Sequence, residues 1–143
     1  MNVYVDSSVL LRVVLAERGR LREWRRIRRA VSSELIGVEC RRTIDRARIR
    51  MRLSDEEVAD RRTAIGEWID ALDLVRLDAP ILERASQPFP TLLRTLDALH
   101  LASALAARAS VADLVFATHD EELAVAAKAV GFRVLGASTR GAA

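Results

Sequence analysis

The chain has 143 residues, 50% of them hydrophobic and 30% charged, with a formal net charge of +3. This length is enough for one domain with a sizeable core. No stretch approaches the roughly 18 apolar residues of a membrane span, and Asp6 and Arg12 interrupt the apolar beginning, so we expect neither a membrane anchor nor a secretory signal. The single cysteine, Cys40, cannot form an internal disulfide, and we expect it to be a small buried side chain in a cytoplasmic protein.

One strand and four helices are predicted in the first half of the chain. Residues 3–5 are β-branched and aromatic, which favours a buried strand. Ser54 and Glu57 have the spacing of a capping box, which predicts the start of a helix. Apolar residues at helical spacing predict the others. The four helices are expected over residues 7–17, 21–31, 36–51 and 54–72.

Strands and helices alternate in the second half of the chain. Strands are expected over residues 74–77, 114–118 and 132–135, and helices over 81–85, 95–108 and 120–130. This alternation predicts right-handed βαβ units in a single three-layer α/β/α domain with a mostly parallel central sheet. We expect the domain to cover residues 1–135, followed by a flexible tail over 136–143.

Two aspartates follow predicted strands, at the edge where parallel sheets bind ligands. Asp6 comes directly after the first strand, and Asp120 comes two residues after Thr118. Both also precede predicted helices. Each can therefore be a helix N-cap instead, which is the commoner role of an isolated aspartate at that position.

Two further acids fall on apolar helix faces. Glu39 is three residues after Ile36 and next to Cys40, and Asp97 stands in the segment LDALHLA. A carboxylate in such surroundings is costly unless a partner neutralises it. His100 can share a helix face with Asp97, and we expect it to pack or support rather than to bind metal, because Mg²⁺ prefers oxygen ligands.

The four acids together suggest a metal site. Two unit charges about 4 Å apart repel by roughly 4 kcal/mol at an effective dielectric constant near 20, so several carboxylates in one pocket need a cation. A ligand set of oxygens suits Mg²⁺ or Mn²⁺. Such ions promote attack on phosphorus, which predicts a phosphodiesterase.

The basic residues are almost all arginine, since Lys128 is the single lysine. Seven arginines lie between positions 18 and 29, and six between 41 and 52. Arginine binds phosphate oxygens in pairs, although such runs are equally consistent with solvated helix faces. Aromatic residues are only 4%, which disfavours a base-stacking platform, so any nucleic acid would be held mainly through phosphates. Candidate phosphate ligands are Arg41, Arg42 and Arg94.

Four segments, in order, each contain one of these acids. They are VDSSVLL (residues 5–11), SELIGVECRR (33–42), RTLDALHLA (94–102) and FATHDEEL (116–123). In these segments the chain resembles the PIN-domain ribonucleases, and most closely the VapC-type toxins of bacterial toxin–antitoxin pairs. The resemblance covers nearly the whole chain.

The resemblance implies a Mg²⁺- or Mn²⁺-dependent endoribonuclease that leaves a 3′-hydroxyl and a 5′-phosphate. It makes Asp6 and Asp97 the principal metal ligands, while Glu39 holds the metal through water or positions the nucleophile, and Asp120 completes the pocket. Supporting hydrogen bonds would come from Ser8 and Thr118. The resemblance also implies a homodimer and a small VapB-like antitoxin whose C-terminal segment enters the acidic groove.

Other functions are open on the sequence alone. A PIN nuclease that processes RNA without being a toxin shares the chemistry, and a non-catalytic module that binds RNA or a partner shares the charge. A phosphoacceptor receiver domain needs an acid pair near the first strand and a lysine beyond the last, but Lys128 lies within a predicted helix. Haloacid-type phosphatases need a second aspartate at the position of Ser8.

Overall fold

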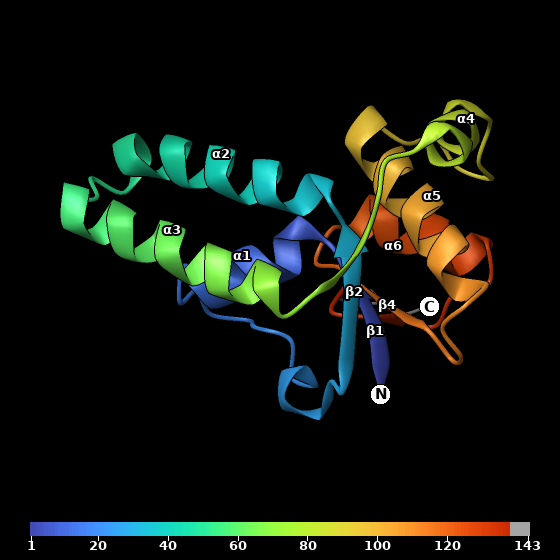
Figure 1. Ribbon diagram of the computed structural model, residues 1–143, viewed down its shortest axis with the longest axis horizontal. Coiled ribbons are helices and arrows are strands. Elements are labelled where there is room, and N and C mark those ends of the chain that lie inside the picture. Colours follow the sequence, from blue (N-terminus) through green and yellow to red (C-terminus); the bar gives the residue numbers. More distant parts are fainter. Residues whose placement is uncertain (138–143) are drawn as a thin grey trace, which may run out of the picture.

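Five parallel strands form the central sheet of the computed structural model, which describes residues 1–137 (Figure 1). They are β1 (Asn2–Val5), β2 (Arg29–Ser33), β3 (Asp73–Val75), β4 (Val115–Ala117) and β5 (Val134–Leu135). Their order is β3-β2-β1-β4-β5, and every neighbouring pair is parallel. The prediction of a parallel, three-layer α/β/α fold is confirmed.

Helices cover both faces of the sheet (Figure 1). On one face lie α1 (Ser7–Val14), α2 (Leu35–Arg50) and α3 (Asp55–Asp70). On the other lie α5 (Thr95–Arg108) and α6 (Glu121–Ala129), with α4 (Ala79–Ser86) packed against α5. No helix within residues 1–137 is both long and apolar enough to cross a membrane.

Alternate residues of β1 belong to two separate cores. Val3 and Val5 pack with α1, α2 and α3, while Tyr4 packs with α5 and α6. Successive side chains of a strand point to opposite faces, so a central strand covered on both sides is apolar throughout. The ring of Tyr4 stacks on that of Phe116 from β4, with 5.2 Å between centroids.

The predicted helix over residues 21–31 is wrong. This segment holds one 3₁₀ turn, η1 (Trp24–Arg26), and then enters β2, which pairs with β1 in the register Tyr4–Val31. Apolar residues at positions 21, 24, 27 and 31 recur at intervals of three and four, which imitates a helix. A strand results because residues 31–33 are buried between β1 and β3, where Ser32 Oγ donates to the Val5 carbonyl (2.7 Å).

The other predicted elements are present, but some bounds differ. Helix α1 ends at Val14 rather than at residue 17, β3 covers 73–75 rather than 74–77, and β5 covers only 134–135 of the predicted 132–135. The capping box of Ser54 and Glu57 is present at the start of α3, and α5 has the predicted bounds. Cys40 is fully buried, and burial raises the pKa of its thiol to about 12, as suits a packing residue. Of the expected tail, Gly136 and Ala137 are described and residues 138–143 lie outside the described part of the chain. His119 Nδ1 contacts the Gly136 carbonyl at 2.9 Å, so the chain is held at that residue.

Candidate active site

The strand order reverses between β1 and β4. From β1 the chain moves to β2 and β3 on one side, whereas β4 and β5 lie on the other. The carboxyl ends of two such strands leave a crevice, because the segments that follow them diverge. Asp6 follows β1 at this crevice, and Thr118 and Asp120 follow β4.

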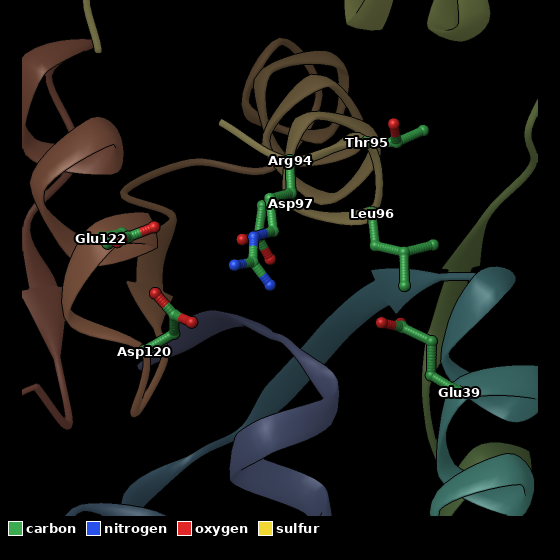
Figure 2. Close-up of a pocket in the computed structure, with 7 residues that line it drawn as sticks. All are labelled: Glu39, Arg94, Thr95, Leu96, Asp97, Asp120 and Glu122. Atoms are coloured by element: carbon green, nitrogen blue, oxygen red, sulfur yellow. The ribbon is translucent and has the colours of Figure 1, made fainter. Parts of the chain in front are cut away.

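A cavity of about 650 Å³ opens at this edge of the sheet (Figure 2). Three of the predicted acids line it: Glu39 from α2, Asp97 from the first turn of α5, and Asp120 at the start of α6. Glu122 adds a fourth carboxylate, which the sequence reasoning did not single out. Figure 2 shows the carboxylates of Glu39 and Asp120 pointing toward the centre from opposite sides. The cavity is therefore strongly acidic.

In the described part of the chain, Arg94 is the one basic residue that lines this cavity. It is the residue before α5, and Figure 2 shows its guanidinium directed into the pocket beside Asp97. Arg42 borders an adjoining hollow that also includes Glu39, whereas the side chain of Arg41 lies against Gly37 and lines neither space. Of the three predicted phosphate ligands, Arg94 is therefore the one placed in the acidic pocket.

Asp6 is buried next to the cavity, with 4% of its surface exposed. Its Oδ1 accepts hydrogen bonds from Ser8 Oγ (2.6 Å) and the Val9 amide (3.1 Å), and its Oδ2 accepts one from Thr118 Oγ1 (2.5 Å). Asp6 thus caps α1, as one of the two sequence readings allowed. Burial raises the pKa of Asp6 even though these donors and the nearby His100 favour the charged form.

The two hydroxyls around Asp6 also hold the segment after β4. Ser8 Oγ accepts from the His119 amide (2.9 Å), and Thr118 Oγ1 accepts from the Asp120 amide (3.0 Å). Each hydroxyl donates to Asp6 and accepts from this backbone, so its hydrogen is committed to the aspartate. The start of α6, where Asp120 Oδ1 caps the Leu123 amide (2.8 Å), is therefore fixed relative to Asp6.

Asp97 experiences the combined charge of the other acids. Burial, together with repulsion from Asp120, Asp6 and Glu39, raises the pKa of Asp97 to about 6, although His100 opposes this shift. A carboxyl group with such a pKa lies in a place where a cation would be stabilised. The electrostatics of the pocket therefore fit a bound cation.

Glu39 is held by a hydrogen-bonded chain that runs into the core. His100 Nε2 contacts Glu39 Oε1 at 2.5 Å, and His100 Nδ1 contacts the hydroxyl of Tyr4 at 2.8 Å. Tyr4 and His100 are 0% and 1% exposed. The sequence predicts that His100 shares a helix face with Asp97, whereas it marks Tyr4 only as part of a buried strand.

Burial and charge act in opposite directions on His100. Burial lowers the pKa of the imidazole, but the hydrogen bond to Glu39 and the negative charges of Glu39, Asp6 and Asp97 outweigh it, so the pKa is raised. Burial also raises the pKa of Tyr4 well above its ordinary value. Tyr4 therefore stays protonated. A neutral His100 would accept a hydrogen bond from the Tyr4 hydroxyl at Nδ1 and donate one from Nε2 to Glu39.

The donor set suits a hard divalent ion, but the ligands do not form a closed shell. Carboxylate and hydroxyl oxygens surround the pocket, which is the chemistry that Mg²⁺ and Mn²⁺ favour. Among residues 1–137, no three His, Cys, Asp or Glu side chains are grouped so that they could hold a metal ion. Mg²⁺ commonly keeps several waters and uses one or two carboxylates, so a closed protein shell is not required.

The fold and the pocket define an α/β domain with an acidic ligand site where the strand order reverses. The family model of the PIN domain matches residues 3–129. The chain is 34% identical over 139 residues to Ribonuclease VapC46 of Mycobacterium tuberculosis. The aligned region covers 95% of this chain and 98% of that protein. Ribonuclease VapC47 of the same species is 28% identical over 137 residues, with 91% and 93% covered. The chain therefore belongs to the PIN-domain family and is a VapC-type member.

Proposed function

We propose that this protein is a Mg²⁺- or Mn²⁺-dependent endoribonuclease and acts as the toxin of a toxin–antitoxin pair in the cytoplasm. The names of the two relatives support the ribonuclease activity. One observation carries the metal requirement: four carboxylates, those of Glu39, Asp97, Asp120 and Glu122, line one cavity. Burial and the surrounding acids accordingly raise the pKa of Asp97 to about 6. A pocket with this charge binds RNA phosphates only if a cation accompanies them.

Asp97 and Asp120 would hold the cation directly, with Asp6 beside them and Glu39 acting through water. The cation supplies Lewis-acid stabilisation of the charge that develops on the phosphate oxygens. Asp6 already accepts three hydrogen bonds, which fix its carboxylate and leave it little freedom to reorient. Its contribution is a rigid negative charge at the base of the pocket.

The protein's own groups can orient the reaction. A water oxygen forms a bond to phosphorus while the bond from phosphorus to the 3′ oxygen breaks, leaving a 3′-hydroxyl and a 5′-phosphate. Glu39 Oε2 makes only a 3.3 Å contact with Ser7 Oγ, so it can accept a hydrogen bond from the attacking water. Arg94, whose guanidinium is directed into the pocket beside Asp97, can bind a phosphate oxygen there.

A cleavage assay tests the activity. Purified protein should cut single-stranded RNA in Mg²⁺ or Mn²⁺ but not in EDTA, and Asp97→Asn should abolish cleavage and weaken Mn²⁺ binding in a calorimetric titration. Arg62→Ala is a matched control, since Arg62 is exposed on α3 and lines none of the hollows described. Cleavage that persists in Asp97→Asn protein free of contaminating nuclease would reject the site.

The toxin role needs a different experiment. Expression of the chain should arrest growth, and co-expression of a small antitoxin encoded beside it should relieve the arrest and yield a co-purifying complex of homodimers. An RNA-processing nuclease would cleave RNA without arrest or a neutralising partner. A non-catalytic module would bind RNA without cutting it under any metal condition.

A further inference from the structure

A second hollow lies at the opposite end of the sheet from the acidic pocket. It has a volume of about 440 Å³ and is formed where η1 meets the C-terminal end of α3. Its walls include Trp24, Ile27, Trp68 and Leu72, next to the beginnings of β2 and β3. Asp120 of the acidic pocket follows the carboxyl end of β4, whereas this hollow adjoins the amino ends of β2 and β3, so the length of the strands separates the two.

The two tryptophans of the chain meet at this hollow. Trp24 and Trp68 are the only tryptophans of the chain, and their rings meet edge to face with 5.0 Å between centroids. Both pack partly on the adjoining core but stay incompletely buried, and both line the hollow. The hollow therefore offers aromatic surface of the size and kind on which a planar ring can stack.

Among residues 1–137, the charged residues that line this hollow are Arg25 and Arg28, and none of them is an acid. Both are exposed, and within residues 1–137 neither makes an ion pair. They belong to the run of seven arginines between positions 18 and 29. A second copy of this chain would present the same positive charge here, so self-association through this face is disfavoured.

We propose that this tryptophan–arginine hollow binds single-stranded RNA, with one base against the tryptophans and the flanking phosphates on Arg25 and Arg28. The inference rests on the proposed ribonuclease function. Of the residues that the structure describes, Arg94 is the single arginine lining the acidic pocket, so we expect cationic surface elsewhere to help retain RNA. Indole faces combined with guanidinium groups are the usual means of holding single strands without reading their sequence.

The chain contains its own reporter for this site. Because both tryptophans line the hollow, tryptophan fluorescence should change saturably as a short single-stranded RNA is added in EDTA, with a gel afterwards showing the RNA intact. Trp24→Leu should weaken binding by roughly 5- to 150-fold, the cost of losing one base–aromatic stack. Melting temperatures show whether this variant stays folded, and Arg25→Ala/Arg28→Ala tests the site without altering the aromatic walls.

The arginine pair has a matched control. Arg25→Ala/Arg28→Ala should flatten the log–log salt dependence of binding by about 1.4, at about 0.7 per phosphate contact on a single strand. Arg62→Ala/Lys128→Ala removes the same charge from exposed positions outside the hollow and should leave the slope nearly unchanged. Equal effects of the two pairs would mean that only net charge matters and would overturn the proposal.

Other outcomes separate this site from the catalytic one. If RNA binds, as judged by anisotropy of a labelled strand, but tryptophan emission does not change, the proposal is wrong while the ribonuclease function stands. If emission changes but no metal supports cleavage, the RNA site stands and the proposed function fails. If polyglutamate changes the emission and RNA does not, the hollow binds an acidic protein segment instead, and the proposal is overturned.

Discussion

His100 Nε2 lies 2.5 Å from Glu39 Oε1, which joins a fully buried histidine of α5 to an acid of α2 on the other face of the sheet. The same imidazole contacts Tyr4 in the central strand. Glu39 is therefore oriented from within the core, although its carboxylate faces the pocket. Replacing a residue that orients a catalytic or metal-binding group typically lowers metal affinity or activity by about 10- to 100-fold.

Replacing His100 by Gln should lower kcat by about 10- to 100-fold with a smaller change in KM, because Gln cannot contact Glu39 and Tyr4 together. Tyr4→Phe should lower kcat less, since Nε2 keeps its bond to Glu39. Steady-state kinetics on RNA measures both. Phe116→Leu is the control, because it disturbs the ring stacked on Tyr4 without removing either hydrogen bond. An equal loss of kcat in Phe116→Leu protein that is still folded would indicate a merely structural role.

Acidification should stabilise the metal-free protein in the mildly acidic range. The pKa of Asp97 is about 6 in the folded protein, above its ordinary value of 3.8, so the folded state binds a proton more tightly than the unfolded state between these values. The raised pKa of His100 acts in the same direction, because its stabilisation is present at low pH and is lost as pH rises through the folded pKa. The melting temperature should therefore rise as pH falls from about 7.5 to about 5.5.

Asp97→Asn tests the origin of that dependence, because it removes a carboxyl group whose pKa is raised in the folded protein. Its melting temperature should vary less over the same pH range. Metal should compete with the protons, so Mn²⁺ affinity of the unaltered protein should fall as pH drops below about 6. A melting temperature that falls steadily on acidification to pH about 5.5 would contradict the assignment.

Thr118→Val should both destabilise the protein and reduce its activity. The two side chains are similar in size, but Val leaves Asp6 Oδ2 without its donor and the Asp120 amide without its acceptor. The expected cost is about 1–3 kcal/mol in the free energy of unfolding, measured by denaturant titration. Ser110→Ala serves for comparison, since that hydroxyl donates to a carbonyl at the end of α5 away from the pocket. Similar stabilities of these two variants would count against a special role for Thr118.

Gly136→Ala should destabilise the edge of the sheet next to the site. Gly136 has φ +92°, and a Cβ there would lie 2.7 Å from the carbonyl oxygen of Thr118. The cost should be about 1–3 kcal/mol, from backbone strain at a positive φ together with the clash. Gly66→Ala is the matched substitution, because it meets nothing within 4 Å in α3 and should stabilise by about 0.5–1 kcal/mol. Thermal or chemical unfolding of both proteins gives the comparison.

Much of the fold was predictable because its local signals agree with its tertiary structure. The capping box at Ser54 and the helix over 95–108 are both encoded by neighbours in sequence. Strand β2 was missed because its identity depends on burial between β1 and β3, while its apolar spacing continues that of the preceding residues. A pattern over adjacent residues does not contain that information.

The candidate site was predictable in part for the same reason. Acids that follow strands or stand on apolar helix faces were visible in the sequence, and the structure brings Glu39, Asp97 and Asp120 around one cavity. The hydrogen bond between Glu39 and His100 was not predictable, because it joins residues that are 61 positions apart and lie across the sheet. Glu122 likewise enters the pocket only through the placement of α6.

The pairing of β1 with β4 determines when, during synthesis of the chain, the proposed active site can first form. Residues 3–5 are synthesised long before their partners at 115–117, and Asp97 and Asp120 come from the same later part of the chain. A chain still on the ribosome at residue 96 has Asp6 and Glu39 but neither of the other acids nor the strand that closes the crevice. The order of the chain therefore delays assembly of the proposed site until β4 and the start of α6 have been synthesised.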